Sequence, residues 1–196
     1  MNTAQPIRKT KDLQKLKEYY RVKEPNLRNE LLIITGLNTA LRISDILGIQ
    51  WDMVYDFEQK KYRSHILLVE QKTGKVSSIY INQRIKKVLK KYQAKQKQNG
   101  TPVDPGTYLF CHQERNMPIS RVQAHRIIKK AARESRIPGV VSCHSLRKTF
   151  GYHAWKQGVP PALLMNIYNH SSYQITKRYL GIEQDDRDQI FQKIYL

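Results

Sequence analysis

The stretch SCHSLRKTFGYHAW, residues 142–155, is the part of the sequence that most restricts what the chain can be. It places cationic or titratable side chains beside aromatic ones that belong in a core. His144 and Arg147 are three residues apart, so on a helix they lie on one face. The histidine ring can accept or donate a proton, and the arginine offers a planar fork that suits phosphate oxygens. Taken alone, the pair fits a helix cap or a salt bridge better than a phosphate site.

The charge of the whole chain points to a polyanionic partner. The 196 residues include 35 Lys and Arg against 16 Asp and Glu, which gives a net charge of +19. Such an excess repels itself and does nothing for folding, so it makes sense when the partner is negatively charged. Hydrophobic residues make up 40% of the chain, which is typical of a globular domain. Nucleic acid and anionic membrane are the two candidate partners.

A membrane is the weaker of these candidates. The longest apolar run, LLIITGL at residues 31–37, is far shorter than the ~20 residues that span a bilayer. Residues 1–14 lack the apolar region of a signal peptide. The two cysteines, Cys111 and Cys143, do not form a disulfide framework. The sequence therefore predicts a cytoplasmic protein that binds nucleic acid and no membrane.

Hydrophobic periodicity predicts a mainly α-helical fold with one small antiparallel β-sheet, an α+β class. Residues 62–70 and 75–82 alternate or are β-branched, and a glycine-containing turn between them predicts a hairpin. A strand near residues 53–57 would make this sheet three-stranded. We expect one domain over residues 1–196. Helices are expected at 10–22, capped by Thr10; at 27–39, continuing over 42–49 after a bend near Gly36 and Asn38; and at 83–98, 120–136, 146–157, 160–168 and 172–180.

Two of these helices are strongly basic. Residues 83–98 hold seven Lys or Arg and no acid, and residues 120–136 hold six against one glutamate. A basic helix face is often only a solvated face, and for either helix alone the two interpretations have equal weight. Together with the net charge, they favour contact with a DNA or RNA backbone, whose affinity falls steeply with salt.

Arg42 lies among apolar residues in the segment TALRISDIL, residues 39–47. An arginine in such surroundings is costly unless it is paired or faces a ligand. Asp45 is three residues further on and can hold its guanidinium, so a structural Arg42–Asp45 pair is as good an interpretation as a ligand site. Lys72, in the expected hairpin turn, is either solvated or able to reach into a cleft as a proton donor.

The other reactive side chains give weaker signals. Adjacent Cys and His residues, at 111–112 and 143–144, point apart on regular structure and lack the C-x₂-C spacing of a zinc site, so we expect no metal. His170 precedes Tyr179 by nine residues, and Tyr179 ends a short helix before a glycine. The chain holds twelve tyrosines, so a single tyrosine is more often a packing residue than a reacting one.

The order of these segments is more specific than any one of them. ALRISDIL, QKTGK, HSLRKTF and NHSSYQITKRYLG occur in this sequence order, and together they resemble the catalytic domain of the tyrosine recombinases, the phage integrase family. The resemblance spans roughly residues 27–182, with residues 183–196 as a C-terminal tail. The family's reacting positions fall on Arg42, Lys72, His144, Arg147, His170 and Tyr179, and its supporting acidic position falls on Asp45.

Three departures from the family pattern stand out. Ala40 and Asn169 occupy positions where the family frequently has glycine. Neither position supplies a reacting group, so we expect small local adjustments. The third departure is larger, because family members usually carry an N-terminal core-binding domain that closes a clamp around DNA. Only about two dozen residues precede the match here, so the sequence predicts no such domain and puts independent recombination in doubt.

The resemblance implies cutting and rejoining of DNA through a 3′-phosphotyrosine at Tyr179. Arg42, Arg147 and His170 would stabilise the charge that builds on the nonbridging phosphate oxygens. Lys72 would protonate the leaving 5′ oxygen, and His144 would assist proton transfer from the tyrosine or orient the site. Such chemistry needs neither a cofactor nor a metal. Further DNA contacts are expected from Lys75, Arg121, Arg126, Lys148 and Lys177.

The resemblance also leaves two alternatives and one question of assembly. A type IB topoisomerase uses similar chemistry to relax supercoils, and a DNA-binding regulator could keep the fold without cutting. In the tail, Ile190, Phe191, Ile194 and Tyr195 have the spacing of an apolar helical stripe. This stripe is expected to dock either on a neighbouring subunit of a homo-oligomer assembled on DNA or on the chain's own surface.

Overall fold

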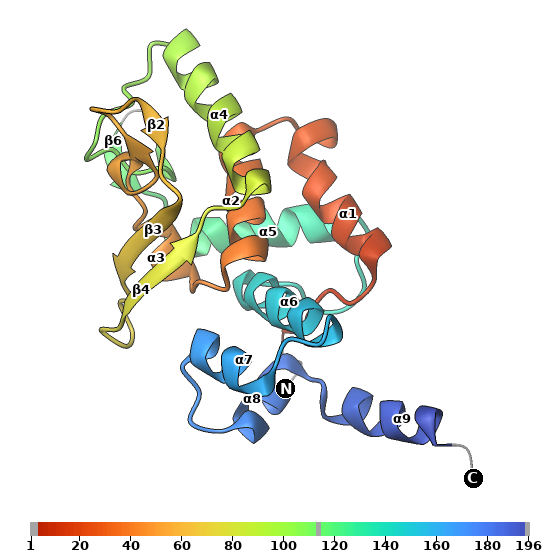
Figure 1. Cartoon of the computed structure of the whole chain (residues 1–196). Helices are drawn as coiled ribbons and strands as arrows, with labels where there is room; N and C mark the ends of the chain where they lie inside the picture. The colour runs from red at the N-terminus through yellow and green to blue at the C-terminus, as the bar shows by residue number, and fades with distance from the viewer. Residues whose placement is uncertain (1–3, 113–114, 195–196) are drawn as a thin grey trace.

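The computed structural model describes residues 4–112 and 115–194, and helices dominate it (Figure 1). The expected α+β class is confirmed. The helices and short helical turns are α1 (Thr10–Glu18), η1 (Tyr19–Lys23), α2 (Leu27–Thr39), α3 (Ile43–Leu47), η2 (Trp51–Met53), α4 (Gln83–Gln98), α5 (Arg121–Glu134), α6 (Cys143–Lys156), α7 (Pro161–Tyr168), α8 (Tyr173–Leu180) and α9 (Glu183–Lys193). The strands are β1 (Tyr55–Asp56), β2 (Lys61–Tyr62), β3 (His65–Val69), β4 (Val76–Tyr80), β5 (Cys111–His112) and β6 (Arg115–Pro118).

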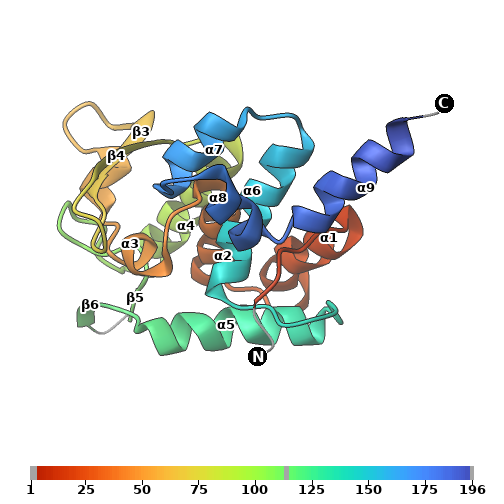
Figure 2. The ribbon, with the colours of Figure 1, turned by 90° about the horizontal axis from the view of Figure 1, so that it is seen from below.

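Helix α2 is the centre of the main hydrophobic core. It is buried along most of its length, and α1, α4, α5 and α6 all pack against it (Figures 1 and 2). Gly36 permits the closest of these approaches, because a Cβ atom there would lie 2.7 Å from Cδ1 of Leu146 on α6. Neighbouring helices thus cover the segment LLIITGL, and this explains why it is apolar on all sides without being a membrane segment. In the described residues no helix is long and apolar enough to cross a membrane.

Three separate antiparallel pairs replace the expected three-stranded sheet. β3 and β4 form the predicted hairpin, in which Leu67 pairs with Ser78 and Val69 with Val76. The strand expected near residues 53–57 does not join it. Its Tyr55 pairs instead with Tyr62 of β2, because the chain turns back at once through residues 57–60, and the two tyrosine rings pack edge to face. The third pair is β5 with β6.

Local capping explains where the helices differ from expectation. α6 starts at Cys143 and not at residue 146, because Ser142 and Ser145 form a reciprocal capping box. Thr10 is the first residue of α1, whereas Lys9 is its cap. The break after α2 lies at Ala40, which adopts a left-handed conformation with φ of 55°, and not at the expected bend near residues 36–38.

A second, smaller core holds the C-terminal helices on α6. Tyr152, Tyr168, Leu180 and Ile182 are buried there together with Ala40. Gly151 lets α7 and α8 approach α6, since a Cβ atom at this position would lie 2.5 Å from Oη of Tyr168 and 2.6 Å from Cδ2 of Leu180. The two cores meet at the break between α2 and α3, where Arg42 is the N-cap of α3.

Helix α9 leaves the body of the molecule (Figures 1 and 2). Its start is tied down by Arg8, which forms an ion pair of 2.8 Å with Asp185. Beyond that point Ile190, Phe191 and Ile194 are 57%, 81% and 56% exposed, so these residues do not dock on the chain's own surface. Tyr195, the fourth residue of the expected stripe, lies outside the described residues.

Candidate active site

The six residues chosen from the sequence lie on or next to α3, α6, α8 and the β3–β4 turn, and Figure 2 shows how these elements are arranged. The charges of two arginines, Arg147 and Arg42, act on both histidines among these residues. Burial lowers the pKa of His170, and the charges of Arg147 and Arg42 lower it further. Burial also lowers the pKa of His144, and the same two arginines add to that effect. Both arginines therefore lie within electrostatic reach of the two histidines, although 105 positions of sequence separate them.

Arg147 is fixed from several sides at the start of α6. Only 5% of the residue is exposed. Its guanidinium donates hydrogen bonds to the carbonyl oxygens of Ala40 and, at 3.5 Å, Tyr168, and it lies 4.8 Å from the centre of the Tyr168 ring. The left-handed turn at Ala40 aims its carbonyl at this arginine. A buried arginine that is held in this way keeps its remaining N–H groups in a defined direction.

Arg42 is held by Glu70, the residue that follows β3. The guanidinium nitrogen Nη1 lies 2.5 Å from a carboxylate oxygen of Glu70, which is itself 6% exposed. The expected partner, Asp45, takes a different role, because its Oδ1 accepts a hydrogen bond of 2.9 Å from the backbone N–H of Gln71. Asp45 therefore joins α3 to the hairpin, and the ion pair of Arg42 is made with another acid.

Lys72 and His144 lie beside these arginines. Lys72 is exposed in the turn between β3 and β4, and its charge is one of those that lower the pKa of His144. The neighbouring Lys75 anchors the turn to α7 through its Nζ, which donates to the carbonyl of Asn166 at 3.4 Å. The turn is thus placed over the site and not directed away from it.

Tyr179 lies inside the site and not outside it. Its ring centre is 5.4 Å from that of His170 and 5.4 Å from that of Tyr168, and Nζ of Lys148 lies 5.1 Å from its centre. Burial raises the pKa of the phenol, while the charges of Arg147 and Arg42 act in the opposite direction. The phenol therefore lies within the electrostatic reach of both arginines.

His170 is oriented by its own helix region. Its Nδ1 lies 3.0 Å from the hydroxyl of Thr176, and its ring stacks on Tyr168 with centres 5.6 Å apart. The preceding Asn169 ends α7 in a left-handed conformation with φ of 55°. Asparagine tolerates this region, which explains how it fills a position where the family frequently has glycine.

Sequence reasoning missed Glu70, Tyr168 and Thr176. A signal for Glu70 was present, because it follows Ile66 and Leu68 at spacings of two and so shares the inward face of the strand. It is also the one acid among residues 62–82. Tyr168 and Thr176 gave no comparable signal, since both lie in ordinary helical patterns and act only through tertiary contacts with Arg147 and His170.

The expected DNA-contacting residues divide into two groups. Lys75, Lys148 and Lys177 lie on the elements that build the site, and all three are half-buried. Lys148 and Lys177 also lie 5.1 and 5.4 Å from the ring centres of Tyr179 and Tyr173. Arg121 and Arg126 are exposed on α5. This helix packs against both α3 and α6, which carry the two arginines of the site.

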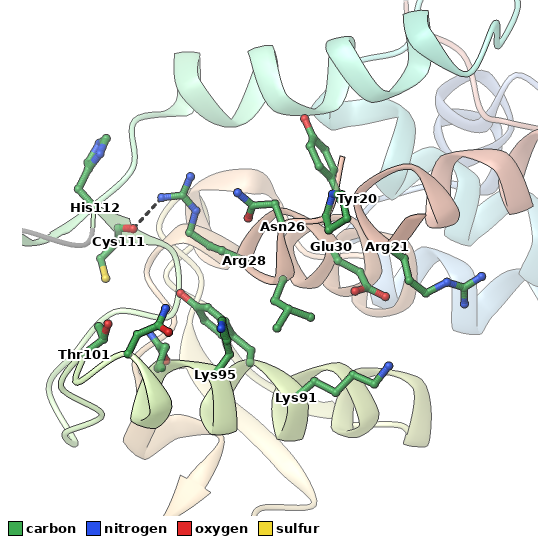
Figure 3. A pocket seen from close by; sticks show the side chains of 15 residues that line it. Tyr20, Arg21, Asn26, Arg28, Glu30, Lys91, Lys95, Thr101, Cys111 and His112 are labelled. Atoms are coloured by element: carbon green, nitrogen blue, oxygen red, sulfur yellow. Dashed lines mark hydrogen bonds between the residues drawn. The ribbon is translucent and has the colours of Figure 1, made fainter. Parts of the chain in front are cut away.

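A cavity with a volume of about 950 Å³ lies elsewhere (Figure 3). It opens between η1, the start of α2 and the end of α4, and none of the six site residues lines it. Arg28 crosses it to donate to the carbonyl of Cys111 at 2.8 Å. Glu30 is buried at its floor, where burial raises the pKa of its carboxyl group. The cavity combines cations with a buried acid and selects no evident ligand.

The two Cys-His pairs do not build a metal site. Cys111 and Cys143 are free thiols, and burial raises the pKa of Cys143 to about 11. Among the residues that the structure describes, His, Cys, Asp and Glu side chains form no cluster with the geometry of a metal centre.

Comparison with known proteins agrees with this geometry. The sequence model described as the phage integrase family matches residues 9–185. The protein named "Probable integrase/recombinase YoeC" of Bacillus subtilis (strain 168) is 40% identical over 185 residues, which cover 94% of this chain and 93% of that protein. The tyrosine recombinase XerC of Thermodesulfovibrio yellowstonii is 23% identical, and the match covers 85% of this chain and 54% of that protein.

Solved structures show the same fold. The XerA recombinase has a TM-score of 0.75 at 19% identity, and the match covers 99% of this chain and 68% of XerA. The XerH site-specific recombinase, solved on a palindromic difH substrate after cleavage, has a TM-score of 0.71 at 18% identity, with 91% of this chain and 50% of XerH covered. The chain thus spans about half the length of XerC and XerH and nearly all of the Bacillus protein.

Proposed function

Because the chain belongs to the phage integrase family, we propose that it cuts and rejoins double-stranded DNA at specific sites, with Tyr179 as the nucleophile. The observation that carries this proposal is the position of Tyr179, which packs against His170 and against Tyr168, the ring on which Arg147 lies. The charges of Arg147 and Arg42 both lower the pKa of its phenol against the effect of burial. A phosphate bound beside Tyr179 would meet both guanidinium groups and the attacking oxygen at once.

The arginines would carry most of the catalytic electrostatics. When a phosphodiester is attacked, its five-coordinate transition state gathers negative charge on the nonbridging oxygens. Arg147 and Arg42 are already fixed by other contacts, so their free N–H groups need little reorganisation to meet this charge. His170 would supply a further donor from the side of α8. With three such groups in place, the reaction needs no metal ion.

Bond making and bond breaking would follow one line through the phosphorus atom. The Tyr179 oxygen forms a bond to phosphorus and loses its proton, and the bond from phosphorus to the 5′ oxygen breaks. Lys72 would donate a proton to that leaving oxygen, and His144 would accept or relay the phenol proton. The number of phosphate ester bonds stays constant, so a free 5′ hydroxyl can reverse the reaction without ATP.

A suicide substrate tests the proposal directly. In DNA that is nicked close to the cleavage position, cleavage releases a short fragment that carries the free 5′ hydroxyl. This fragment diffuses away and cannot reverse the reaction, which traps the covalent adduct. Wild-type protein should give an adduct that denaturing gel electrophoresis resolves, and Tyr179→Phe should give none while it binds the same DNA equally well. If neither protein gives an adduct on DNA that both bind, the nucleophile assignment is rejected. Because the site sequence has to be found first, DNA flanking the gene is the substrate of choice.

We further propose that the chain acts in the cytoplasm and forms a homo-oligomer on DNA. The λ integrase, whose fold this chain shares with a TM-score of 0.65, has been solved as a dimer on a core site. On α9 the exposed Ile190, Phe191 and Ile194 leave an apolar surface with no partner inside the described chain. Deleting residues 184–196 should reduce self-association on DNA while leaving single-site binding unchanged. Unchanged self-association would rule out the tail as the contact.

A further inference from the structure

Glu70 lies at the junction of two groups that the reaction would use. Its Oε2 accepts from Nη1 of Arg42 at 2.5 Å and from the hydroxyl of Thr73 at 3.2 Å. Its Oε1 accepts from the hydroxyl of Ser77 at 2.8 Å. One carboxylate therefore accepts hydrogen bonds from three side chains. They belong to Arg42 at the start of α3, to Thr73 next to Lys72, and to Ser77 on β4.

The backbone of Glu70 closes the turn that carries Lys72. Its N–H donates to the carbonyl of Lys75 at 2.9 Å, and its own carbonyl accepts from the N–H of Gly74 at 2.8 Å. Asp45 adds a second attachment by accepting from the N–H of Gln71. The turn is thus fixed at its base by residues that also fix Arg42, and Lys72 is held at its tip.

The charge of Glu70 also needs an explanation. A carboxylate beside a phosphate site repels the substrate, and a buried one is costly unless it is paired. Burial raises the pKa of Glu70, but hydrogen bonds from Ser77, Arg42 and Thr73 outweigh burial and hold it below its usual value. The chain keeps this residue ionised at a place where its charge opposes substrate binding. A neutral residue would serve a purely structural purpose at lower cost.

We propose that Glu70 is a positioning residue, which aims Arg42 at the scissile phosphate and fixes the Lys72 turn to the same frame. The proposal rests on the proposed function for the identity of the reaction. Glu70 takes one guanidinium nitrogen and leaves the other free for a phosphate oxygen. It thereby couples the group that stabilises the transition state to the group that protonates the leaving oxygen.

This role predicts a separation of binding from chemistry. Glu70→Gln removes the negative charge but keeps the size and one acceptor oxygen. Its DNA affinity should equal or exceed that of wild type, because the substrate is no longer repelled. Its single-turnover cleavage rate should fall at least about tenfold, since small misplacements of catalytic groups cost up to about a hundredfold. A structural role would instead lower affinity and cleavage together.

The experiment measures affinity and single-turnover adduct formation for wild type, Glu70→Gln and a matched control, Glu58→Gln. The control removes the same charge from an exposed position in the β1–β2 turn and should match wild type in both assays. Cleavage by Glu70→Gln at the wild-type rate would overturn the proposal. Parallel loss of affinity and cleavage would overturn it as well.

A second measurement does not depend on DNA cleavage and so separates this inference from the proposed function. Trypsin cuts after Lys72 and Lys75, and the rate of this cut in the native protein reports how well the turn is held. The rate should rise severalfold in Glu70→Ala and stay unchanged in Glu58→Gln. If wild type forms no adduct, the proposed function fails, but an unaltered tryptic rate in Glu70→Ala is what would reject the role of Glu70.

Discussion

At the scale of single residues, the site is built from cations that are oriented before substrate arrives. Arg147 donates to the backbone carbonyls of Ala40 and Tyr168, so its direction is set by peptide groups and not by side chains that rotate. Arg42 has a carboxylate as its partner. This difference matters, because a carbonyl leaves the full charge of Arg147 for the phosphate, whereas Glu70 offsets part of the charge of Arg42.

Replacing Arg147 by lysine should therefore be far from conservative. Arg147→Lys keeps one positive charge but loses the planar fork that bonds two carbonyls and a phosphate together. The single-turnover cleavage rate should fall by about a hundred- to a thousandfold, as on removal of one oxyanion donor. The measurement is adduct formation on the suicide substrate, with Arg133→Lys at the exposed end of α5 as control. A loss of less than about tenfold would contradict the assigned role.

The histidine pKa values predict how stability depends on pH. Burial and the neighbouring arginines lower the pKa of His170 in the folded protein, so the unfolded chain binds a proton more readily. The stability that neutral His170 contributes is therefore fully present above its pKa in the unfolded chain, near 6.5. It is lost as the pH falls through the lower pKa of His170 in the folded protein.

His170→Gln should therefore flatten the fall of the melting temperature between about pH 7 and pH 5. The exposed His125 on α5 provides a matched control, and His125→Gln should keep the wild-type slope. Identical slopes for all three proteins, followed by thermal denaturation, would show that His170 does not contribute to the pH dependence.

The sequence pointed to the candidate site residues but not to the contacts that hold them. Ordered motifs place Arg42 and Arg147 without knowledge of the fold. Asp45 was one of two interpretations of the surroundings of Arg42, offered because a spacing of three is the interaction that a continuous helix would favour. The wrong assumption was local, because Arg42 is the cap of α3 and its side chain leaves the helix toward β3. Long-range pairing of this kind does not follow from spacing.

At the scale of elements, periodicity served well where the chain is long and regular. The helix over residues 83–98 has the predicted bounds, and α5 begins one residue after the predicted start, because the side chain of Ser120 caps it by accepting from the N–H of Gln123. Periodicity failed at the short strand β1. Two residues carry too little pattern to specify a partner, and the nearby turn brings Tyr55 to a local partner, Tyr62.

The contact of α6 with α7 and α8 gives a prediction at this scale. Gly151→Ala should destabilise the protein by about 1–3 kcal/mol, because the added methyl group overlaps Tyr168 and Leu180 in a packed core. The shift should also lower cleavage, since α8 carries Tyr179 and the segment after α7 carries His170. Gly106→Ala is the control, because a Cβ atom there meets nothing within 4 Å. Denaturant unfolding measures the change, and equal stability of the two variants would refute the close packing.

At the scale of the whole molecule, two basic helices contribute strongly to the net charge of +19, and the sequence did not distinguish them. Their packing does distinguish them. α5 contacts α3 and α6, the elements that carry Arg42 and Arg147, whereas α4 packs mainly against α2 (Figure 1). α4 also contributes Lys91 and Lys95 to the cavity in Figure 3, where none of the six site residues lies. DNA held at the site is thus next to α5.

This difference predicts a difference in salt dependence. The logarithm of DNA affinity falls linearly with the logarithm of salt concentration, with a slope of about 0.9 for each phosphate contact. The double variant Arg121→Gln, Arg126→Gln on α5 should reduce the slope by about two. Lys90→Gln, Lys97→Gln removes the same charge from exposed positions on α4 and should leave the slope near that of wild type. Fluorescence anisotropy from about 50 to 200 mM salt measures both. Equal reductions would mean that the protein attracts DNA by its total charge, and the placement of DNA along α5 would then be wrong.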